Sequence, residues 1–272
     1  MNDIRLALVN GTGPPGPAYD DIMKTSFVYQ LGQTLGAKSF YQRGPKLFGH
    51  EVLDEAHAVY RWLKSAYEDD PSYRLMLAGY SRGGSAAMMA CEMLERDGIP
   101  VDSLFLFDAV ARHNFRGGVV IPANVRFSRH ARRSLAQDFV EKYEGHIGLI
   151  GGFQNPIRPL FGNVGLTWRG DGDHRPAETF FGSHGALGGV GWRVVVEDTE
   201  CERAVAEFMS ENLRSRGVEV DLAAFAPQAD AVMTHPSHLE KWLTHNLYQF
   251  VVPHDEPHMI DHAPADDPQK VG

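Results

Sequence analysis

The sequence predicts an α/β protein with a mostly parallel central β-sheet and helices on both of its faces. Over the first 108 residues, short apolar runs alternate with helical patterns, which is typical of a parallel sheet covered on both sides. A glycine-rich turn at residues 79–83 joins an apolar run to a helical pattern, as a strand–turn–helix unit requires. The chain has 272 residues, of which 43% are hydrophobic, so it is long enough for one large domain with its own core.

The first part of the chain predicts two strands and one helix. Residues 4–9, Ile-Arg-Leu-Ala-Leu-Val, are an apolar run that predicts a strand. Residues 10–17 are rich in glycine and proline, which excludes helix and strand. Residues 21–36 place apolar side chains at helical spacing, and Gly36 ends this helix. Residues 38–42 predict a second strand.

The next segments predict the centre of the sheet. Residues 50–67 have an amphipathic pattern that predicts a helix. Residues 73–79 predict a strand, and residues 82–96 predict a helix that Asp97-Gly98 ends. Residues 101–107 are an apolar run that predicts a further buried strand, with Asp108 at its end.

The second half of the chain has fewer regular patterns. Residues 124–128 predict a short strand and residues 129–143 a helix. Residues 145–176 are rich in glycine, proline and aromatic residues, and we expect a long loop that covers the substrate. Helices are predicted at residues 199–216 and 238–250.

The whole pattern predicts one domain over residues 1–252. We expect residues 253–272, which are rich in histidine, aspartate and proline, to form a poorly ordered tail.

The composition excludes several classes of protein. The formal net charge of −9 at pH 7 argues against a nucleic-acid partner held through its phosphates. No apolar run approaches the ~18 residues of a transmembrane helix, and the N-terminus lacks the pattern of a secretory signal. The two cysteines, Cys91 and Cys201, form no disulfide framework, so we expect free thiols in a reducing cytoplasm.

The segment Gly79-Tyr80-Ser81-Arg82-Gly83 predicts a nucleophile. It is a G-x-S-x-G motif between a predicted strand and a predicted helix, and the alternative is a structural glycine turn. A turn this tight strains the backbone at Ser81 and leaves no room for side chains at Gly79 and Gly83. The strain would expose Ser81 Oγ at the carboxyl end of the strand, with the Arg82 amide pointing to where an oxyanion forms.

A serine nucleophile needs a base, and the base needs a carboxylate that orients it. Among the 13 histidines we favour His184, because its glycine-rich loop can bring an imidazole to the strand ends; a surface histidine is the alternative. Asp108 ends a buried strand beside the turn, where an unpaired carboxylate would be costly. For Asp108 the alternative role is an N-cap, and Asp171 and Asp173 are the rival acids.

The segment Gly11-Thr12-Gly13 follows the first predicted strand and predicts the second oxyanion donor. Its flexibility allows a backbone N–H to face the oxyanion, and Thr12 could add its hydroxyl. The alternative is a simple turn before Pro14. Because parallel strands end at one edge of a sheet, we expect this segment, Ser81 and Asp108 to lie at the same edge.

Two further clusters are candidates for binding sites. Basic residues near position 130 fit either an anionic head group or a solvated helix face. They are Arg126, Arg129, His130, Arg132 and Arg133. The C-terminal histidines have spacings that fit no metal-ligand motif. They are His235, His238, His245, His254, His258 and His262. We therefore expect no metal here, and the chemistry of a serine, histidine and aspartate triad requires no organic cofactor.

Four segments together carry a family resemblance. Residues 10–13, Asn-Gly-Thr-Gly, are similar to a D-G-T-x-N opening, and residues 79–84 to a G-F-S-R-G-A elbow. Residues 107–110, Phe-Asp-Ala-Val, are similar to a W/F-D-T-V motif, and residues 181–189 to F-P-G-x-H-S-D-V-G-G. In this order and rough spacing, they resemble a bacterial α/β-hydrolase family that includes phospholipase effectors of type VI secretion systems.

The resemblance implies an α/β-hydrolase-like three-layer sandwich. It also implies that Asp108 is the triad acid and His184 the triad base, rather than the rival carboxylates and histidines. The chain departs from the family at Asn10, where the family has aspartate, and at Ala186-Leu187, where it has Ser-Asp. A secretion apparatus is the partner that the resemblance implies, with export that needs no Sec signal.

The sequence therefore predicts a serine hydrolase that acts on a small-molecule or lipid carboxylic ester. The resemblance extends the expected substrates to phospholipids. Turnover would pass through an acyl-enzyme on Ser81. The alternatives are a non-catalytic binding protein on the same scaffold, and an acyltransferase or peptidase with the same triad.

Overall fold

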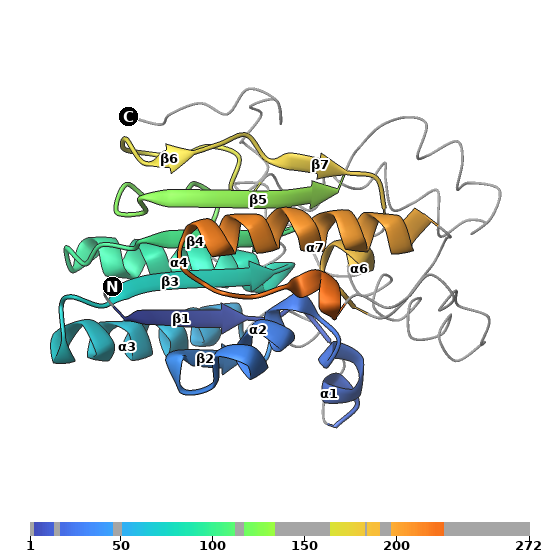
Figure 1. The fold of residues 1–272 in the computed structure, drawn as a ribbon. Coiled ribbons are helices and arrows are strands. Elements are labelled where there is room, and N and C mark those ends of the chain that lie inside the picture. The colour runs from blue at the N-terminus through green and yellow to red at the C-terminus, as the bar shows by residue number, and fades with distance from the viewer. Residues whose placement is uncertain are drawn as a thin grey trace.

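The computed structural model describes residues 3–13, 17–45, 51–111, 117–133, 164–182, 184–190 and 197–225 (Figure 1). The strands are β1 (Ile4–Val9), β2 (Ser39–Gln42), β3 (Arg74–Tyr80), β4 (Ser103–Phe107), β5 (Phe127–Arg133), β6 (Asp173–His174) and β7 (Glu178–Phe180). The α-helices are α1 (Ala18–Met23), α2 (Phe27–Leu35), α3 (Val52–Asp69), α4 (Arg82–Arg96), α6 (His184–Leu187) and α7 (Glu197–Ser215). Short 3₁₀ helices are η1 (Gly36–Lys38) and η3 (Leu222–Ala224).

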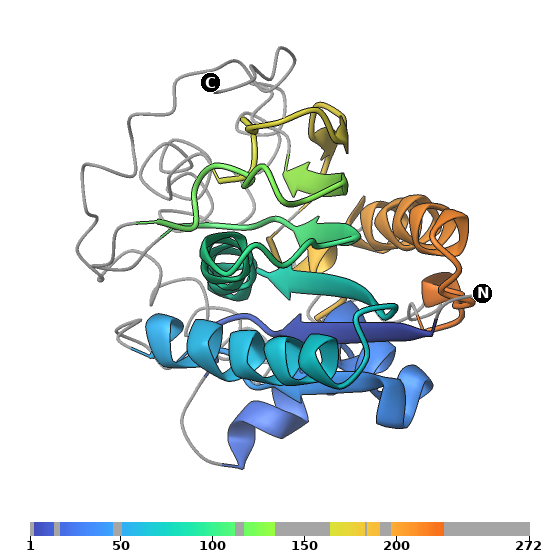
Figure 2. The same ribbon diagram turned by 90° about the vertical axis from the view of Figure 1, so that its left-hand side faces the viewer.

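The strands form one seven-stranded sheet in which every pairing is parallel. The strand order is β2-β1-β3-β4-β5-β6, and β7 also pairs with β5. Helices lie on both faces of the sheet, as the two views show (Figures 1 and 2). The fold is therefore an α/β-hydrolase-like three-layer sandwich, and the fold class predicted from the sequence is confirmed.

Successive residues of a strand face opposite sides of the sheet, and β1 shows how this builds two cores. Leu6 and Leu8 pack into the core beneath α2, α6 and α7. Ala7 and Val9 pack into the core beneath α3 and α4. All four side chains are fully buried, so β1 stabilises both layers at once.

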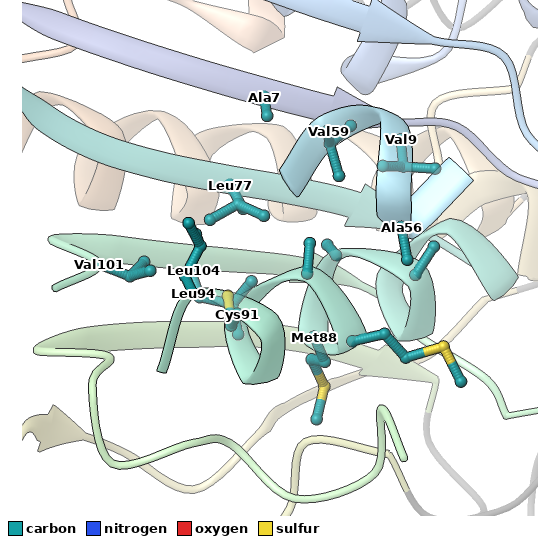
Figure 3. Close-up of a cluster of buried hydrophobic side chains, with 14 of the residues drawn as sticks. Ala7, Val9, Ala56, Val59, Leu77, Met88, Cys91, Leu94, Val101 and Leu104 are labelled. Atoms are coloured by element: carbon teal, nitrogen blue, oxygen red, sulfur yellow. The ribbon is translucent and has the colours of Figure 1, made fainter. Parts of the chain in front are cut away.

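The core beneath α3 and α4 is made of closely packed aliphatic side chains and sulfur-containing ones (Figure 3). Leu77 of β3 and Leu104 of β4 lie against the α4 side chains Met88, Cys91 and Leu94. Cys91 is a free thiol, and burial raises its pKa well above the ordinary value. We therefore assign Cys91 to packing rather than to chemistry.

The strands end in register, which places the predicted functional segments at one edge. Val9 pairs with Gly79 between β1 and β3, and Tyr80 pairs with Phe107 between β3 and β4. The residues that follow these strands therefore meet at the carboxyl edge of the sheet, as the sequence predicts.

The helix predicted over residues 21–36 is two helices, α1 and α2. Ser26 interrupts the pattern because its backbone is extended, with φ −60° and ψ 145°. Its Oγ accepts a hydrogen bond from the Tyr29 N–H at 3.2 Å and so caps α2. Gly36 follows the end of α2, as predicted.

The helix predicted over residues 129–143 is wrong where the structure describes it. The strand predicted over residues 124–128 is present, but it begins at Phe127 and continues to Arg133 as the buried strand β5. The polar sequence Phe-Ser-Arg-His-Ala-Arg-Arg has little strand character, and its pairing with β4, β6 and β7 decides its conformation. Residues 134–143 lie outside the described residues.

The basic residues near position 130 are consequently not a solvated helix face. Arg129, His130, Arg132 and Arg133 are buried in β5, and Arg126 alone of this set is exposed. Arg129 is compensated locally, because its Nη2 lies 3.1 Å from Asp173 Oδ2 and its guanidinium stacks on the Phe127 ring. The described part of this cluster therefore forms no open basic patch.

The long loop predicted over residues 145–176 is only partly within the described residues. In the described part, Val164 and Trp168 are buried against the α3/α4 core, and β6 begins at Asp173. Helix α7 matches the prediction for residues 199–216. The helix predicted over 238–250 and the tail from Pro253 lie outside the described residues. Among the described helices, none combines the length and apolar character that crossing a bilayer demands.

Glu55 is a buried acid on α3 whose charge state should govern stability. The residue is 4% exposed, and within the described residues its Oε2 has no hydrogen-bond partner. Burial raises the pKa of Glu55 to about 9, from an ordinary value of 4.5, although the charge of Arg82 partly opposes this rise. The unfolded chain releases this proton above about pH 4.5, whereas the folded state keeps it until about pH 9. The protein therefore loses stability as the pH rises between these values.

We expect Glu55→Gln to remove this loss of stability at high pH, because glutamine carries no charge at any pH. The free energy of unfolding in urea should rise by about 2–4 kcal/mol at about pH 8 and change little at about pH 5. Glu68→Gln, an exposed position on the same helix, is the matched control and should show no such pH dependence. An increase in the free energy of unfolding that is equal at both pH values, or a decrease at about pH 8, would contradict the prediction.

Candidate active site

Ser81 occupies the sharp turn between β3 and α4. Its backbone has φ 57° and ψ −132°, a strained conformation for a residue with a side chain. Neighbouring backbone holds the strain in place. The Ser81 N–H donates to the Phe107 carbonyl at 3.0 Å, and the Ser81 carbonyl accepts from the N–H groups of Val110 and Gly84 at 3.1 and 3.0 Å. The turn is therefore rigid.

Both elbow glycines are required by close backbone approach. A Cβ at Gly79 would collide with the backbone of Gly83 and Gly84. A Cβ at Gly83 would collide with the carbonyl oxygens of Val9 and Asn10. Glycine at these two positions allows α4 to begin directly against the ends of β1 and β3.

His184 begins α6 and lies between Ser81 and Asp108. Its Nε2 is 3.0 Å from Ser81 Oγ, and its Nδ1 is 2.6 Å from Asp108 Oδ2. The exposed fractions are 1% for Ser81, 1% for His184 and 0% for Asp108. The expectation that the turn exposes Ser81 Oγ is therefore wrong, because His184 and the loop at Gly11 pack against the Ser81 side chain. The structure thus brings the three side chains into one continuous, buried chain of hydrogen bonds.

Asp108 is held at the end of β4 by the neighbouring strand β5. Its N–H donates to the Ala131 carbonyl at 2.7 Å, and its Oδ1 accepts from the Arg133 N–H at 3.1 Å. The Arg133 guanidinium lies nearby, with Nε 3.9 Å from Asp108 Oδ2. A hydrogen-bonded carboxylate near a cation can remain ionised although it is fully buried. Sequence reasoning named Arg133 only as part of a basic cluster and missed its position beside Asp108, because it placed this residue on a helix.

The rival acids lie elsewhere. Asp173 is on β6 and pairs with Arg129, and Asp171 is exposed just before that strand. The carboxylate that contacts the imidazole of His184 is that of Asp108.

The loop Gly11-Thr12-Gly13 follows β1 at the same edge of the sheet. The Gly11 N–H donates to Asn10 Oδ1 at 2.8 Å, so this amide already has an acceptor. Thr12 Oγ1 accepts from Arg82 Nη1 at 3.2 Å. The amides of Thr12 and Gly13 make no hydrogen bond to another described residue. They are the donors that this loop can offer to a substrate.

Two residues to which sequence reasoning gave no role in the site anchor this loop. Asn10 Nδ2 donates to Ser26 Oγ at 2.7 Å and to the Tyr41 hydroxyl at 3.0 Å. The Tyr19 hydroxyl donates to the Gly11 carbonyl at 2.8 Å and accepts from the Gly44 N–H at 2.6 Å. Asn10 was visible in the sequence only as a departure from a family motif, and Tyr19 had no sequence signal.

The described residues contain no group of three or more His, Cys, Asp or Glu side chains that could hold a metal ion. The C-terminal histidines lie outside the described residues.

Comparisons with known proteins find one family model and several solved structures that are similar to part of this chain. Residues 35–127 match the family model of the thioesterase domain, a segment that contains Ser81 and Asp108 but not His184. No curated protein matches the chain. Among solved structures, a cutinase-like protein from Cryptococcus sp. is similar, with 14% identity, a TM-score of 0.27, and coverage of 46% of this chain and 75% of that chain.

Two structures of the RedJ thioesterase from the prodiginine biosynthetic pathway of Streptomyces coelicolor are also similar. One has 14% identity, a TM-score of 0.34, and coverage of 67% of this chain and 80% of that chain. The other, with a polyethylene glycol molecule bound in its active site, has 14% identity, a TM-score of 0.37, and coverage of 76% and 93%.

Proposed function

We propose that this protein is a serine hydrolase that cleaves a carboxylic ester through an acyl-enzyme intermediate on Ser81. The observation that carries the proposal is the buried chain of hydrogen bonds from Ser81 Oγ through His184 to Asp108, next to a strained turn. Strain at functional residues is typical of active sites, and a hydroxyl paired with an oriented imidazole is the arrangement that nucleophilic catalysis needs.

In the first step, Ser81 Oγ attacks the acyl carbonyl while His184 Nε2 accepts the hydroxyl proton. Asp108 stabilises the imidazolium that forms and holds its Nδ1–H. The proton on Nε2 then passes to the leaving oxygen as the bond between that oxygen and the acyl carbon breaks. The product alcohol departs, and the acyl group remains on Ser81.

The negative charge on the carbonyl oxygen requires donors on the opposite side of the carbon. The proposal assigns this role to the Arg82 amide, at the N-terminus of α4, together with the amide of Thr12 or Gly13. Helix N-termini present amides that the helix itself does not use. The Gly11 amide is not assigned, because it donates to Asn10.

In the second step, water attacks the acyl-enzyme with His184 Nε2 as its base. The tetrahedral intermediate collapses, Ser81 Oγ takes the proton back, and the carboxylic acid leaves. The cycle consumes one ester and one water molecule, and it uses no atom from a cofactor.

The finer proposals concern the substrate and the partner. The resemblance to a bacterial α/β-hydrolase family that includes type VI secretion phospholipases supports a lipid or phospholipid ester as substrate and a secretion apparatus as partner. A thioester is the second candidate, because the thioesterase family model matches the segment that holds the elbow and the acid. Both candidates transfer an acyl group to Ser81, and they differ in the leaving group.

The test is a substrate panel with Ser81→Ala as control. The panel contains p-nitrophenyl esters and acyl-coenzyme A thioesters with matched short, medium and long acyl chains, and phospholipid vesicles. Ser81-dependent hydrolysis with a higher kcat/KM for the oxygen esters or the phospholipids supports the ester proposal. A higher kcat/KM for the thioesters favours the second candidate.

Two results would contradict hydrolysis. Absence of turnover together with absence of Ser81 labelling by a fluorophosphonate would favour a non-catalytic binding protein on this scaffold. Acyl transfer to an added alcohol or amine in large excess over transfer to water would favour an acyltransferase.

A further inference from the structure

Tyr80 lies at the end of β3, immediately before Ser81, and is fully buried. Its hydroxyl donates to the backbone carbonyl of His184 at 3.0 Å. Its ring stacks on the imidazole of His184, with ring centroids 4.9 Å apart and an angle of 29° between the planes. A single side chain therefore contacts both the backbone and the ring of the candidate base.

The Tyr80 ring also contacts the two segments that flank the site. A Cβ at Gly11 or at Gly188 would collide with this ring. Gly11 belongs to the loop after β1, and Gly188 follows the helix that His184 begins. The Gly188 carbonyl in turn accepts the N–H of Phe27, the first residue of α2. The Tyr80 ring thus lies between the loop Gly11-Thr12-Gly13 and the segment that carries His184.

The helix that carries His184 cannot hold it by itself. Helix α6 has four residues, and so short a helix is not stable through its own hydrogen bonds. The position of the imidazole therefore depends on contacts made by other parts of the fold. Asp108 contacts the ring at Nδ1, and Tyr80 contacts the ring face and the main chain.

We infer that Tyr80 is a positioning residue that holds His184 in line with Ser81 for proton transfer. The inference rests on the proposed function, because it concerns the rate of the step in which His184 takes the Ser81 proton. Small displacements of a reacting group can lower rates strongly, so contacts that hold the imidazole should appear in kcat rather than in KM.

Two substitutions separate the contacts of Tyr80. Tyr80→Phe keeps the ring and removes the hydroxyl, and Tyr80→Leu removes the ring as well. We expect Tyr80→Phe to lower kcat about 3- to 10-fold with KM within about twofold of the wild-type value, as loss of one hydrogen bond implies. Tyr80→Leu should lower kcat about 100-fold. The rate constant for Ser81 labelling by a fluorophosphonate should fall in parallel, with unchanged final stoichiometry.

Tyr60→Phe is the matched control. It removes a tyrosine hydroxyl that donates to Asp97 Oδ2 at 2.7 Å. This hydrogen bond joins α3 to the residue after α4 and involves none of the residues of the candidate site. Its kcat, KM and labelling rate should equal those of the wild type. The thermal midpoint of each variant shows that the protein assayed is folded.

Wild-type kcat and labelling rate in folded Tyr80→Phe would overturn the inference while leaving the proposed function intact. So would a change confined to KM. If Tyr80→Leu fails to fold, Tyr80→Phe alone decides. Absence of turnover and of labelling in the wild type would instead contradict the proposed function, so the two failures can be distinguished.

Discussion

Ser81→Ala is expected to lower kcat by about 10,000-fold or more on the best substrate of the panel. In the proposed mechanism, the substitution removes the atom that forms the acyl-enzyme, whereas the proposed donors for the oxyanion stay in place. The residual rate would come from substrate binding and from those donors. Since alanine is smaller than serine and the backbone of the turn is held by hydrogen bonds of its own, the fold should be kept.

Steady-state kinetics, fluorophosphonate labelling and thermal unfolding check this prediction together. Ser85→Ala is the matched control, because Ser85 is a buried serine one turn further along α4. Its Oγ donates to the Gly118 carbonyl at 3.0 Å, so its loss should cost about 1 kcal/mol of stability and leave turnover unchanged. A Ser81→Ala variant that retains wild-type turnover would exclude Ser81 as the nucleophile.

Asp108→Asn is expected to lower kcat by about 10,000-fold while keeping the shape of the site. The asparagine oxygen can still accept the Arg133 N–H, which now bonds Asp108 Oδ1. The amide nitrogen would then face His184 Nδ1 as a donor. The imidazole would be forced to carry its proton on Nε2, where it faces Ser81, and could not accept the serine proton. The loss of the carboxylate also removes the charge that stabilises the imidazolium.

This substitution suits the backbone at position 108. The residue has φ 38°, in the left-handed region, which asparagine adopts as readily as aspartate does. Asp173→Asn provides the control at a rival carboxylate, which pairs with Arg129 and not with His184. Its turnover should equal that of the wild type. The reverse outcome, with loss of turnover in Asp173→Asn and none in Asp108→Asn, would assign the acid to β6 and contradict the proposed triad.

The elbow shows what a local pattern can predict. The elbow is one contiguous segment made of strand β3, the turn at Ser81 and helix α4. Its geometry can therefore be predicted directly from its residue types and their periodicity. The strained φ at Ser81 and the absence of space at Gly79 and Gly83 follow from that local geometry. The structure shows the strand, the strained turn and the helix where the sequence predicts them.

The partners of Ser81 could not be deduced in this way. His184 lies 103 positions from Ser81 and 76 positions from Asp108, and loop context alone left several histidines and three aspartates as candidates. The family resemblance selected Asp108 and His184, and the structure places both within hydrogen-bond distance of each other. Tyr80 lies within the elbow motif, but at a position whose role the motif does not state, and Tyr19 lies in no motif. Neither role could be deduced from the sequence, because the contacts of both hydroxyls are with backbone atoms of distant segments.

The sequence by itself determined the alternation of strands and helices up to Asp108, the turn that presents Ser81, and the common edge at which the strands end. These features depend on residues that are neighbours along the chain. The tertiary structure decided that residues 129–133 continue a strand instead of forming a helix, and that Ser26 divides the first helical segment. It also decided which imidazole contacts the hydroxyl of Ser81 and which carboxylate contacts that imidazole. The physical reason is that pairing with neighbouring strands and hydrogen bonding to buried backbone outweigh the local preferences of a polar or short segment.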